Sequence, residues 1–163
     1  MAIVNSSSQA SISDGFLRLA SEIVRNRQSP EEALRSAVSR AYYSVFLTAR
    51  DRLFGSDAVG LTSRIRNKLI RRFRHKHGWI PGSHDRIIFA ITDLPFSPII
   101  RPLTLSQQIS ELKEARIHAD YYLTNDKLKT IPYDTWLAYT DRMVALASQL
   151  LPAARQLPPY PLT

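Results

Sequence analysis

The stretch from Ser29 to Phe54 reads SPEEALRSAVSRAYYSVFLTARDRLF, and its spacing of apolar residues decides the fold class. Apolar side chains recur every three or four residues along it, which is the period of an α-helix and not the alternation of a strand. Ser29 before Pro30, with Glu32 three residues after the serine, predicts a helix that begins in a capping box. Gly55 follows the stretch and is expected to end the helix.

This predicted helix is apolar on two sides. The main side carries Leu34, Val38, Ala41, Tyr42, Val45, Ala49 and Leu53. Arg40, Tyr43 and Leu47 lie on the other side, at positions i, i+3 and i+7. A helix with two apolar sides lies at the centre of a bundle or meets a partner chain. We therefore expect Arg40, Tyr43 and Leu47 to be covered by the last helix or by a second copy of the chain.

The rest of the chain has the same helical period, with few glycines. Further helices are expected at about 13–27, 62–76, 84–91 (capped by Ser83), 105–123 and 132–151, with an irregular connection over 94–102. The predicted fold is all-α: an antiparallel, up-and-down bundle of four to five helices with a basic helical insertion. The expected organisation is a flexible tail over 1–10, the bundle over 11–152 and a Pro-rich tail over 153–163.

The Pro-rich tail leaves three possibilities open. It could be disordered, it could form a strap across the bundle, or its RQLPPYP stretch (155–161) could act as a polyproline ligand. The first two are the more common fates of such a segment.

Composition limits the function classes. The 163-residue chain contains no Cys, which excludes disulfides, thiolate metal sites and a Cys nucleophile. Residues 1–15 lack the features of a secretory signal, and no run approaches the roughly 20 apolar residues that cross a bilayer. We expect a soluble, cytoplasmic protein with no membrane partner. His75, His77 and His84 lack helical ligand spacing and lie among cations, so neither a metal nor another cofactor is expected.

Positive charge is concentrated in one segment. The chain holds 22 Lys and Arg against 14 Asp and Glu, a net charge of +8. The segment from Ala58 to His84 has no acidic residue, and its cations are Arg64, Arg66, Lys68, Arg71, Arg72, Arg74 and Lys76. Cations contact phosphates and aromatic rings stack on bases, so these cations with Phe73 and Trp79 predict binding of RNA or a nucleotide. The alternatives are a solvated face with both aromatic residues in the core, or a surface for an acidic protein.

A second group of polar and aromatic residues lies in ELKEARIHADYYL, residues 111–123. The expected apolar stripe of this helix consists of Leu105, Ile109, Leu112, Ala119 and Leu123. Arg116 falls at the edge of that stripe, and Asp120 at i+4 is expected to pair with it inside the bundle. His118 lies on a flank and Tyr121 points away. The pair could serve packing alone, or it could belong to a functional pocket.

Three stretches resemble signatures of the HEPN family of helical bundles. SRAYYSVFLTARDRL (39–53) resembles the signature of its second helix. GSHDRII (82–88) and LKEARIHADYYL (112–123) are similar to the G-S-H and R-x-x-A-D-Y signatures of one branch. The signature positions in this chain are Arg40, Tyr43, His84, Arg116, Asp120 and Tyr121.

The resemblance implies an up-and-down bundle, often a homodimer, that acts in RNA cleavage or nucleotide recognition. It also implies a minimal nucleotidyltransferase as partner, in a toxin–antitoxin or defence pair. Nuclease members carry an R-x4–6-H motif, in which Arg would steady the phosphate charge and His would move the proton of the 2′-hydroxyl without a metal. The positions four to six residues after Arg116 hold Asp120, Tyr121 and Tyr122, so the His is missing.

The function expected from the sequence is therefore an RNA- or nucleotide-binding module without catalytic residues. The first alternative is a metal-independent ribonuclease that uses Arg116 and His118. The second is a structural or regulatory helical protein that binds an acidic partner through the basic segment.

Overall fold

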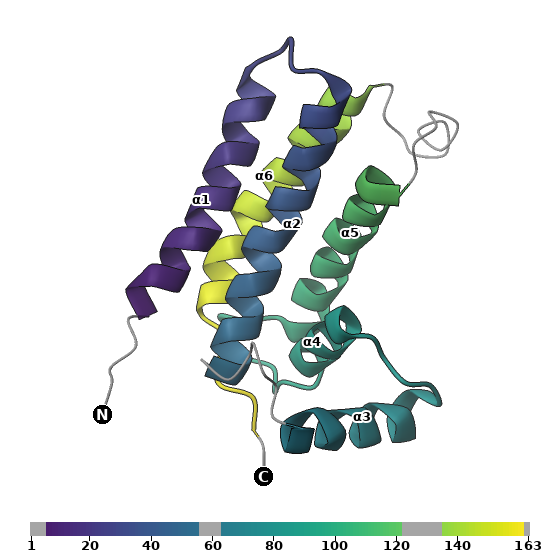
Figure 1. Cartoon of the computed structure of the whole chain (residues 1–163). Coiled ribbons are helices and arrows are strands. Elements are labelled where there is room, and N and C mark those ends of the chain that lie inside the picture. The colour runs from purple at the N-terminus through teal and green to yellow at the C-terminus, as the bar shows by residue number, and fades with distance from the viewer. Residues whose placement is uncertain (1–5, 56–62, 122–134, 162–163) are drawn as a thin grey trace.

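The computed structural model describes residues 6–55, 63–121 and 135–161, with side chains over 12–55, 66–121 and 135–161 (Figure 1). Its helices are α1 (Ser6–Arg25), α2 (Glu31–Phe54), α3 (Ser63–His77), α4 (Ser83–Thr92), α5 (Pro102–Tyr121) and α6 (Trp136–Arg155). These described residues contain no strand, which confirms the all-α prediction.

The bundle is built around α2. The helices α1, α5 and α6 pack against it, with α1 and α5 running one way and α2 and α6 the other (Figure 1). The helices α3 and α4 lie at the end of the bundle where α2 finishes, and together they form the insertion between α2 and α5. The predicted up-and-down bundle with a basic helical insertion is therefore the observed arrangement.

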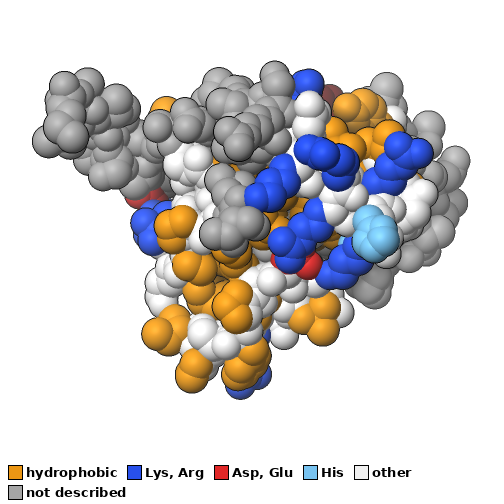
Figure 2. Space-filling model, turned by 90° about the horizontal axis from the view of Figure 1, so that it is seen from below, with side chains coloured by type: hydrophobic (Ala, Val, Ile, Leu, Met, Phe, Trp, Pro, Cys, Tyr) orange, Lys and Arg blue, Asp and Glu red, His pale blue; other side chains and the backbone are white. Residues whose placement is uncertain are grey.

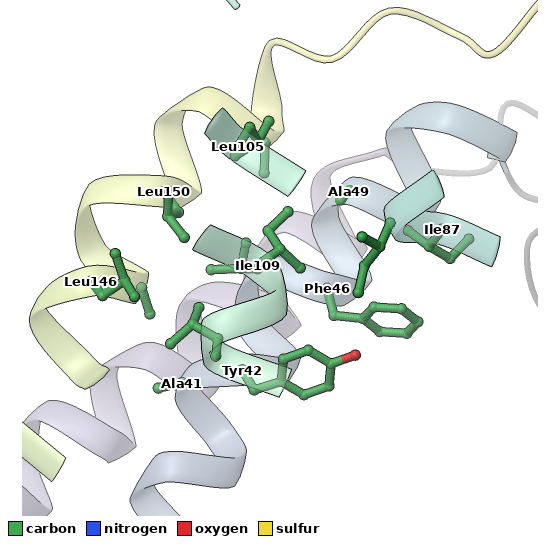
Figure 3. Packing of buried hydrophobic residues seen from close by; sticks show 14 of the residues in the cluster. Ala41, Tyr42, Phe46, Ala49, Ile87, Leu105, Ile109, Leu146 and Leu150 are labelled. Atoms are coloured by element: carbon green, nitrogen blue, oxygen red, sulfur yellow. The ribbon is translucent and has the colours of Figure 1, made fainter. Parts of the chain in front are cut away.

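Side chains from each of the helices α1 to α6 meet in the core. Those labelled in Figure 3 are Ala41, Tyr42, Phe46 and Ala49 of α2, Ile87 of α4, Leu105 and Ile109 of α5, and Leu146 and Leu150 of α6. Val38, Tyr42 and Val45, on the main side predicted for α2, are completely inaccessible to solvent. The members of the predicted α5 stripe that the structure describes are buried as well, while Leu123 lies outside the described residues.

On the other side of α2, Tyr43 is covered by residues of α4 and α5. Tyr43 and Leu47 are partly buried against the core. The Tyr43 ring lies beside His84 of α4, with ring centroids 6.2 Å apart, and the Arg116 guanidinium of α5 lies over it. The expectation that the last helix covers this side is therefore wrong for Tyr43, because the insertion and α5 fill that place. Pairing with a second copy stays a prediction.

Two predicted helix caps are also wrong. The N-cap of α2 is Pro30, and the Ser29 hydroxyl donates instead to the carbonyl of Ile23 at 2.7 Å. The serine therefore closes the turn from α1 into α2 and is not free to cap. In α4, Ser83 is the first helical residue and Gly82 is the N-cap. Between the two helices of the insertion, Gly78 follows the last residue of α3 with a φ of 77°.

Both ends of the chain are more structured than the expected tails. The helix α1 begins at Ser6, inside the segment predicted to be flexible, and α6 continues through Pro152 to Arg155. Leu157 and Tyr160 are buried, and the Tyr160 N–H donates to the Leu53 carbonyl at 2.8 Å. Of the three possibilities for the Pro-rich tail, the structure shows the strap.

Candidate functional site

Aromatic contacts attach α3 to the rest of the molecule. Leu69 and Phe73, one helical turn apart, are buried. The Phe73 ring packs against Phe89 of α4 with centroids 5.4 Å apart, and His77 stacks on the same Phe89 ring at 4.5 Å. The side of α3 that carries these residues is therefore held against α4, and the opposite side is left to solvent.

Asp93, which caps the end of α4, sets the rotation of α3. Its side chain is 6% exposed, and its carboxylate lies 2.7 Å from Lys76 Nζ and 3.1 Å from Arg72 Nε. The Tyr160 hydroxyl donates to the same carboxylate at 3.2 Å. Two of the seven predicted binding cations, Arg72 and Lys76, are thus already engaged in holding the insertion together. A phosphate could bind them only by competing with Asp93.

The remaining described cations of α3 face solvent. Arg66, Lys68, Arg71 and Arg74 are exposed, and the last three lie on the side opposite the buried stripe. Figure 2 shows Lys and Arg side chains gathered over this end of the molecule. Arg71 and Arg74 have no carboxylate partner among the described residues. Arg64 belongs to α3, but its side chain lies outside the described part.

The two aromatic residues predicted to stack on bases differ in position. Phe73 is in the core, as the solvated-face alternative expected. Trp79 is 48% exposed and packs edge-on against Phe89 at 5.6 Å. Trp79 is therefore positioned to meet a base, and Phe73 is not.

A second group of predicted residues comes together between α2, α4 and α5. Asp120 Oδ2 lies 2.6 Å from Arg116 Nε, and Oδ1 accepts a hydrogen bond from Ser39 Oγ at 2.5 Å. The Nε–H is not aligned for a hydrogen bond, so the contact with Arg116 is an ion pair. The guanidinium lies over the rings of Tyr43 and Tyr121, at 5.5 and 5.6 Å from their centroids. The predicted pairing of Arg116 with Asp120 is confirmed.

Arg116 keeps its positive charge at this junction. Its side chain is 18% exposed, and burial by itself would lower its pKa. Tyr43 and Asp120 outweigh that effect, so the pKa of Arg116 is raised. The guanidinium therefore stays charged, with Asp120 beside it as the neutralising group.

His84 joins this group from α4. Its Nδ1 lies 2.5 Å from the Tyr42 hydroxyl, and its ring stacks on Phe46 with centroids 4.5 Å apart. Burial, followed by the charges of Arg116 and Lys113, lowers the pKa of His84, so the imidazole is neutral at pH 7. Burial raises the pKa of Tyr42, so the phenol keeps its proton and can donate it to Nδ1. In that arrangement Nε2 carries the ring hydrogen.

This geometry suits binding better than acid–base chemistry. A general base needs a free lone pair, and with the phenol as donor Tyr42 occupies the one on His84. A scissile phosphate at Arg116 would also meet the Asp120 carboxylate. His118, the histidine of the ribonuclease alternative, is partly buried on α5.

The signature residues do not all share one place. Tyr43, His84, Arg116, Asp120 and Tyr121 surround the junction of α2, α4 and α5. Arg40 instead donates to the Ser36 carbonyl of its own helix at 3.3 Å, and it joins none of the contacts described for this junction.

The sequence interpretation missed Arg35. This residue is 9% exposed, and its guanidinium lies 4.3 Å from the centroid of the Trp136 ring of α6. It also contacts Glu31 at 2.6 Å and donates to the Ala119 carbonyl of α5 at 3.2 Å. Arg35 therefore links three helices. A possible signal was Glu31 placed four residues before it, the spacing of a helical ion pair.

Comparison of the chain with protein-family models, curated proteins and solved structures finds no match. None of the helices in the described ranges has the length and apolar character needed to pass through a membrane. Within the same ranges, His, Asp and Glu side chains do not gather in threes as a metal site would require. The HEPN resemblance and the functions attached to it stay predictions.

Proposed function

We propose that the chain binds single-stranded RNA through the outer side of α3. The observation that carries the proposal is the placement of Lys68, Arg71 and Arg74 on one exposed side of a helix whose opposite side is buried. Six residues of helix span roughly 9 Å, which is longer than one phosphate group, so this row suits an oligonucleotide better than a mononucleotide. Trp79 adds an exposed ring on which a base can stack.

The arrangement of charge supports an RNA-binding module without cleavage. Arg71 and Arg74 are exposed and have no carboxylate partner among the described residues, whereas Arg72 and Lys76 have a structural partner in Asp93. The HEPN resemblance favours RNA among the polyanions. A nucleotidyltransferase partner, a homodimer and a toxin–antitoxin or defence context belong to the same proposal, and they rest on the resemblance alone.

Salt-dependent binding of RNA tests the proposal. Affinity for a labelled single-stranded RNA should fall with salt, with a log–log slope of about −0.7 for each phosphate contacted. Replacing Lys68, Arg71 and Arg74 by Ala should flatten that slope by about 2 and weaken binding to every sequence alike. This variant leaves Arg72 and Lys76 in place, so α3 stays attached to Asp93.

A matched control removes the same charge elsewhere. Arg18, Arg25 and Arg27 are exposed at α1 and the turn after it, and replacing them by Ala also removes three cations. This control should keep the wild-type slope, because phosphate contacts are local. Equal losses in the two triple variants would assign binding to net charge alone. Salt-insensitive or absent RNA binding by the wild type would remove the proposal.

A second candidate function is metal-independent RNA cleavage. The observation that favours it is that His84 and Arg116 approach the same Tyr43 ring from two helices. In such a reaction the Tyr42 hydroxyl would first turn away from His84 Nδ1, and His84 would then take the proton of the 2′-hydroxyl. The 2′-oxygen would attack phosphorus, the bond from phosphorus to the 5′-oxygen would break, and the imidazolium would return the proton to the 5′-oxygen. Cleavage in EDTA that is lost in both His84→Ala and Arg116→Ala would support it. Intact RNA after incubation with the wild type would exclude it.

A further inference from the structure

A hydrophobic surface lies on the connection between α4 and α5. Phe96, Ile99 and Leu103 are 75%, 72% and 60% exposed, and Pro95 and Pro98 are exposed beside them. We call these five residues the connection patch. Apolar side chains scattered singly over a surface are ordinary, whereas several large ones on one short segment mark an interaction site. Figure 2 shows hydrophobic side chains reaching the surface on the end of the molecule that also carries the Lys and Arg side chains.

The connection patch is held in a defined shape. The Ile100 N–H donates to Ser97 Oγ at 2.9 Å, and the Ser97 N–H donates to the Ile100 carbonyl at 3.1 Å. The Ile100 side chain is buried and anchors the turn, and Asp93 is bound to α3 at the start of the connection. A surface that is already ordered loses little conformational entropy when it binds. The exposure of Phe96 and Ile99 is thus a property of the folded turn.

Positive charge borders the connection patch. Asp93 contacts Arg72 and Lys76 of α3, and Phe96 follows three residues later, so its backbone lies within about 11 Å of Asp93. Arg101 is exposed between Ile99 and Leu103 in the sequence. Residues 94–110 include no Asp or Glu. The connection patch therefore lies on a segment without acidic residues that carries the exposed Arg101 and begins beside α3, whose Arg71 and Arg74 have no carboxylate partner among the described residues.

We propose that the connection patch, with the neighbouring cations, binds an acidic amphipathic segment of a partner protein. The apolar side of such a segment covers Phe96, Ile99 and Leu103, and its carboxylates face Arg101 and α3. A second copy of this chain fits less well, because a twofold contact would bring two cationic ends together. Single-stranded RNA fits less well too, because two of the three large side chains are aliphatic and offer no stacking surface.

Binding of defined peptides tests this proposal independently of RNA. The probe is a synthetic helix of about four turns with Leu on one side and Glu on the other. A second peptide carries Lys in place of Glu, and a third carries Ser in place of Leu. Isothermal titration should show binding of the Glu–Leu peptide only. Equal binding of the Lys–Leu peptide would overturn the charge argument.

Variants of the protein locate the binding surface. Phe96, Ile99 and Leu103 are mostly exposed, so replacing all three by Ser should leave the circular dichroism spectrum of the helices unchanged. The same replacement should lower the affinity for the Glu–Leu peptide by more than about tenfold. Ile12→Ser with Leu19→Ser is the control, because these side chains are 53% and 43% exposed on α1. It should bind the peptide as the wild type does. Unchanged affinity in the triple variant would overturn the proposal, and so would a wild-type dimer that the triple variant converts to a monomer.

Discussion

Replacement of Asp93 by Ala removes a side chain that ties α3, α4 and the C-terminal strap together. Its carboxylate contacts Lys76, Arg72 and the Tyr160 hydroxyl at 2.7, 3.1 and 3.2 Å. The Asp93 side chain is 6% exposed, whereas the side chains of Lys76 and Arg72 are 48% and 51% exposed. The perturbation thus affects one buried anion, two half-exposed cations and one buried hydroxyl.

The magnitude follows from what each group does after the change. The two cations can turn into water, so each lost ion pair costs about 0.5–1 kcal/mol. The Tyr160 hydroxyl loses its acceptor in a buried place, which costs about 1 kcal/mol. Removing the carboxylate also removes its own desolvation penalty, which offsets part of these losses. We expect the free energy of unfolding to fall by about 2 kcal/mol.

Urea unfolding followed by circular dichroism measures the effect. With a slope of roughly 2 kcal/mol per M, the midpoint should fall by about 1 M. Asp14→Ala is the control, because Asp14 pairs with Arg155 while the two side chains are 56% and 44% exposed. The free energy of unfolding of Asp14→Ala should fall by less than about 0.5 kcal/mol. Equal midpoints for the two variants would refute the reasoning that burial of the carboxylate sets its contribution.

Three further predictions concern single positions. Burial, followed by the neighbouring Asp93 carboxylate, raises the pKa of Tyr160 to about 12. The phenol of the unfolded chain titrates near pH 10, so the unfolded chain loses this proton first as the pH rises. Stability should therefore fall between about pH 10 and 12, and Tyr160→Phe should flatten that fall in urea midpoints; an unchanged pH curve would contradict it. Asp120→Ala should lower the free energy of unfolding by about 1–2 kcal/mol. This is less than the loss for a fully buried pair, because the side chains of Asp120 and Arg116 are 31% and 18% exposed. An unshifted melting curve would count against the ion pair. Gly78→Ala should lower the free energy of unfolding by about 1 kcal/mol from backbone strain alone, because φ is 77° and nothing lies within 4 Å of an added Cβ. Gly82→Ala is the control: Gly82 has a φ of −63°, so this replacement should change the urea midpoint less.

The parts of the site that could be predicted are those within one helical turn. Arg116 and Asp120 are four residues apart, so the helix itself brings them together, and the pair was predicted before any fold was known. The contact of His84 with Tyr42 joins residues on two helices, and the spacing of residues within either helix does not predict it. The sequence interpretation rejected His84 as a metal ligand and named it as a signature position only through the family resemblance. Its hydrogen bond and lowered pKa required the folded chain.

The same division applies to the basic segment. The cluster of positive charge on one helix was visible in the sequence. Which cations are already paired was not visible, because Asp93 lies 17 residues beyond Lys76. Arg72 and Lys76 differ from the exposed Arg71 and Arg74 only because the end of α4 brings the Asp93 carboxylate against α3.

The amino-acid sequence alone determined the all-α class, the buried stripes of the long helices, the position of the charge and the ion pair within α5. Each of these depends on a period of 3.6 residues or on neighbours along one helix, which are local properties of the chain. The tertiary structure decided what covers Tyr43, where the Ser29 hydroxyl donates and that the Pro-rich end forms a strap. Those outcomes depend on which distant segment comes to lie against a given side chain. Burial and hydrogen bonds between helices involve residues of both helices, so the residue spacing within one helix does not predict them.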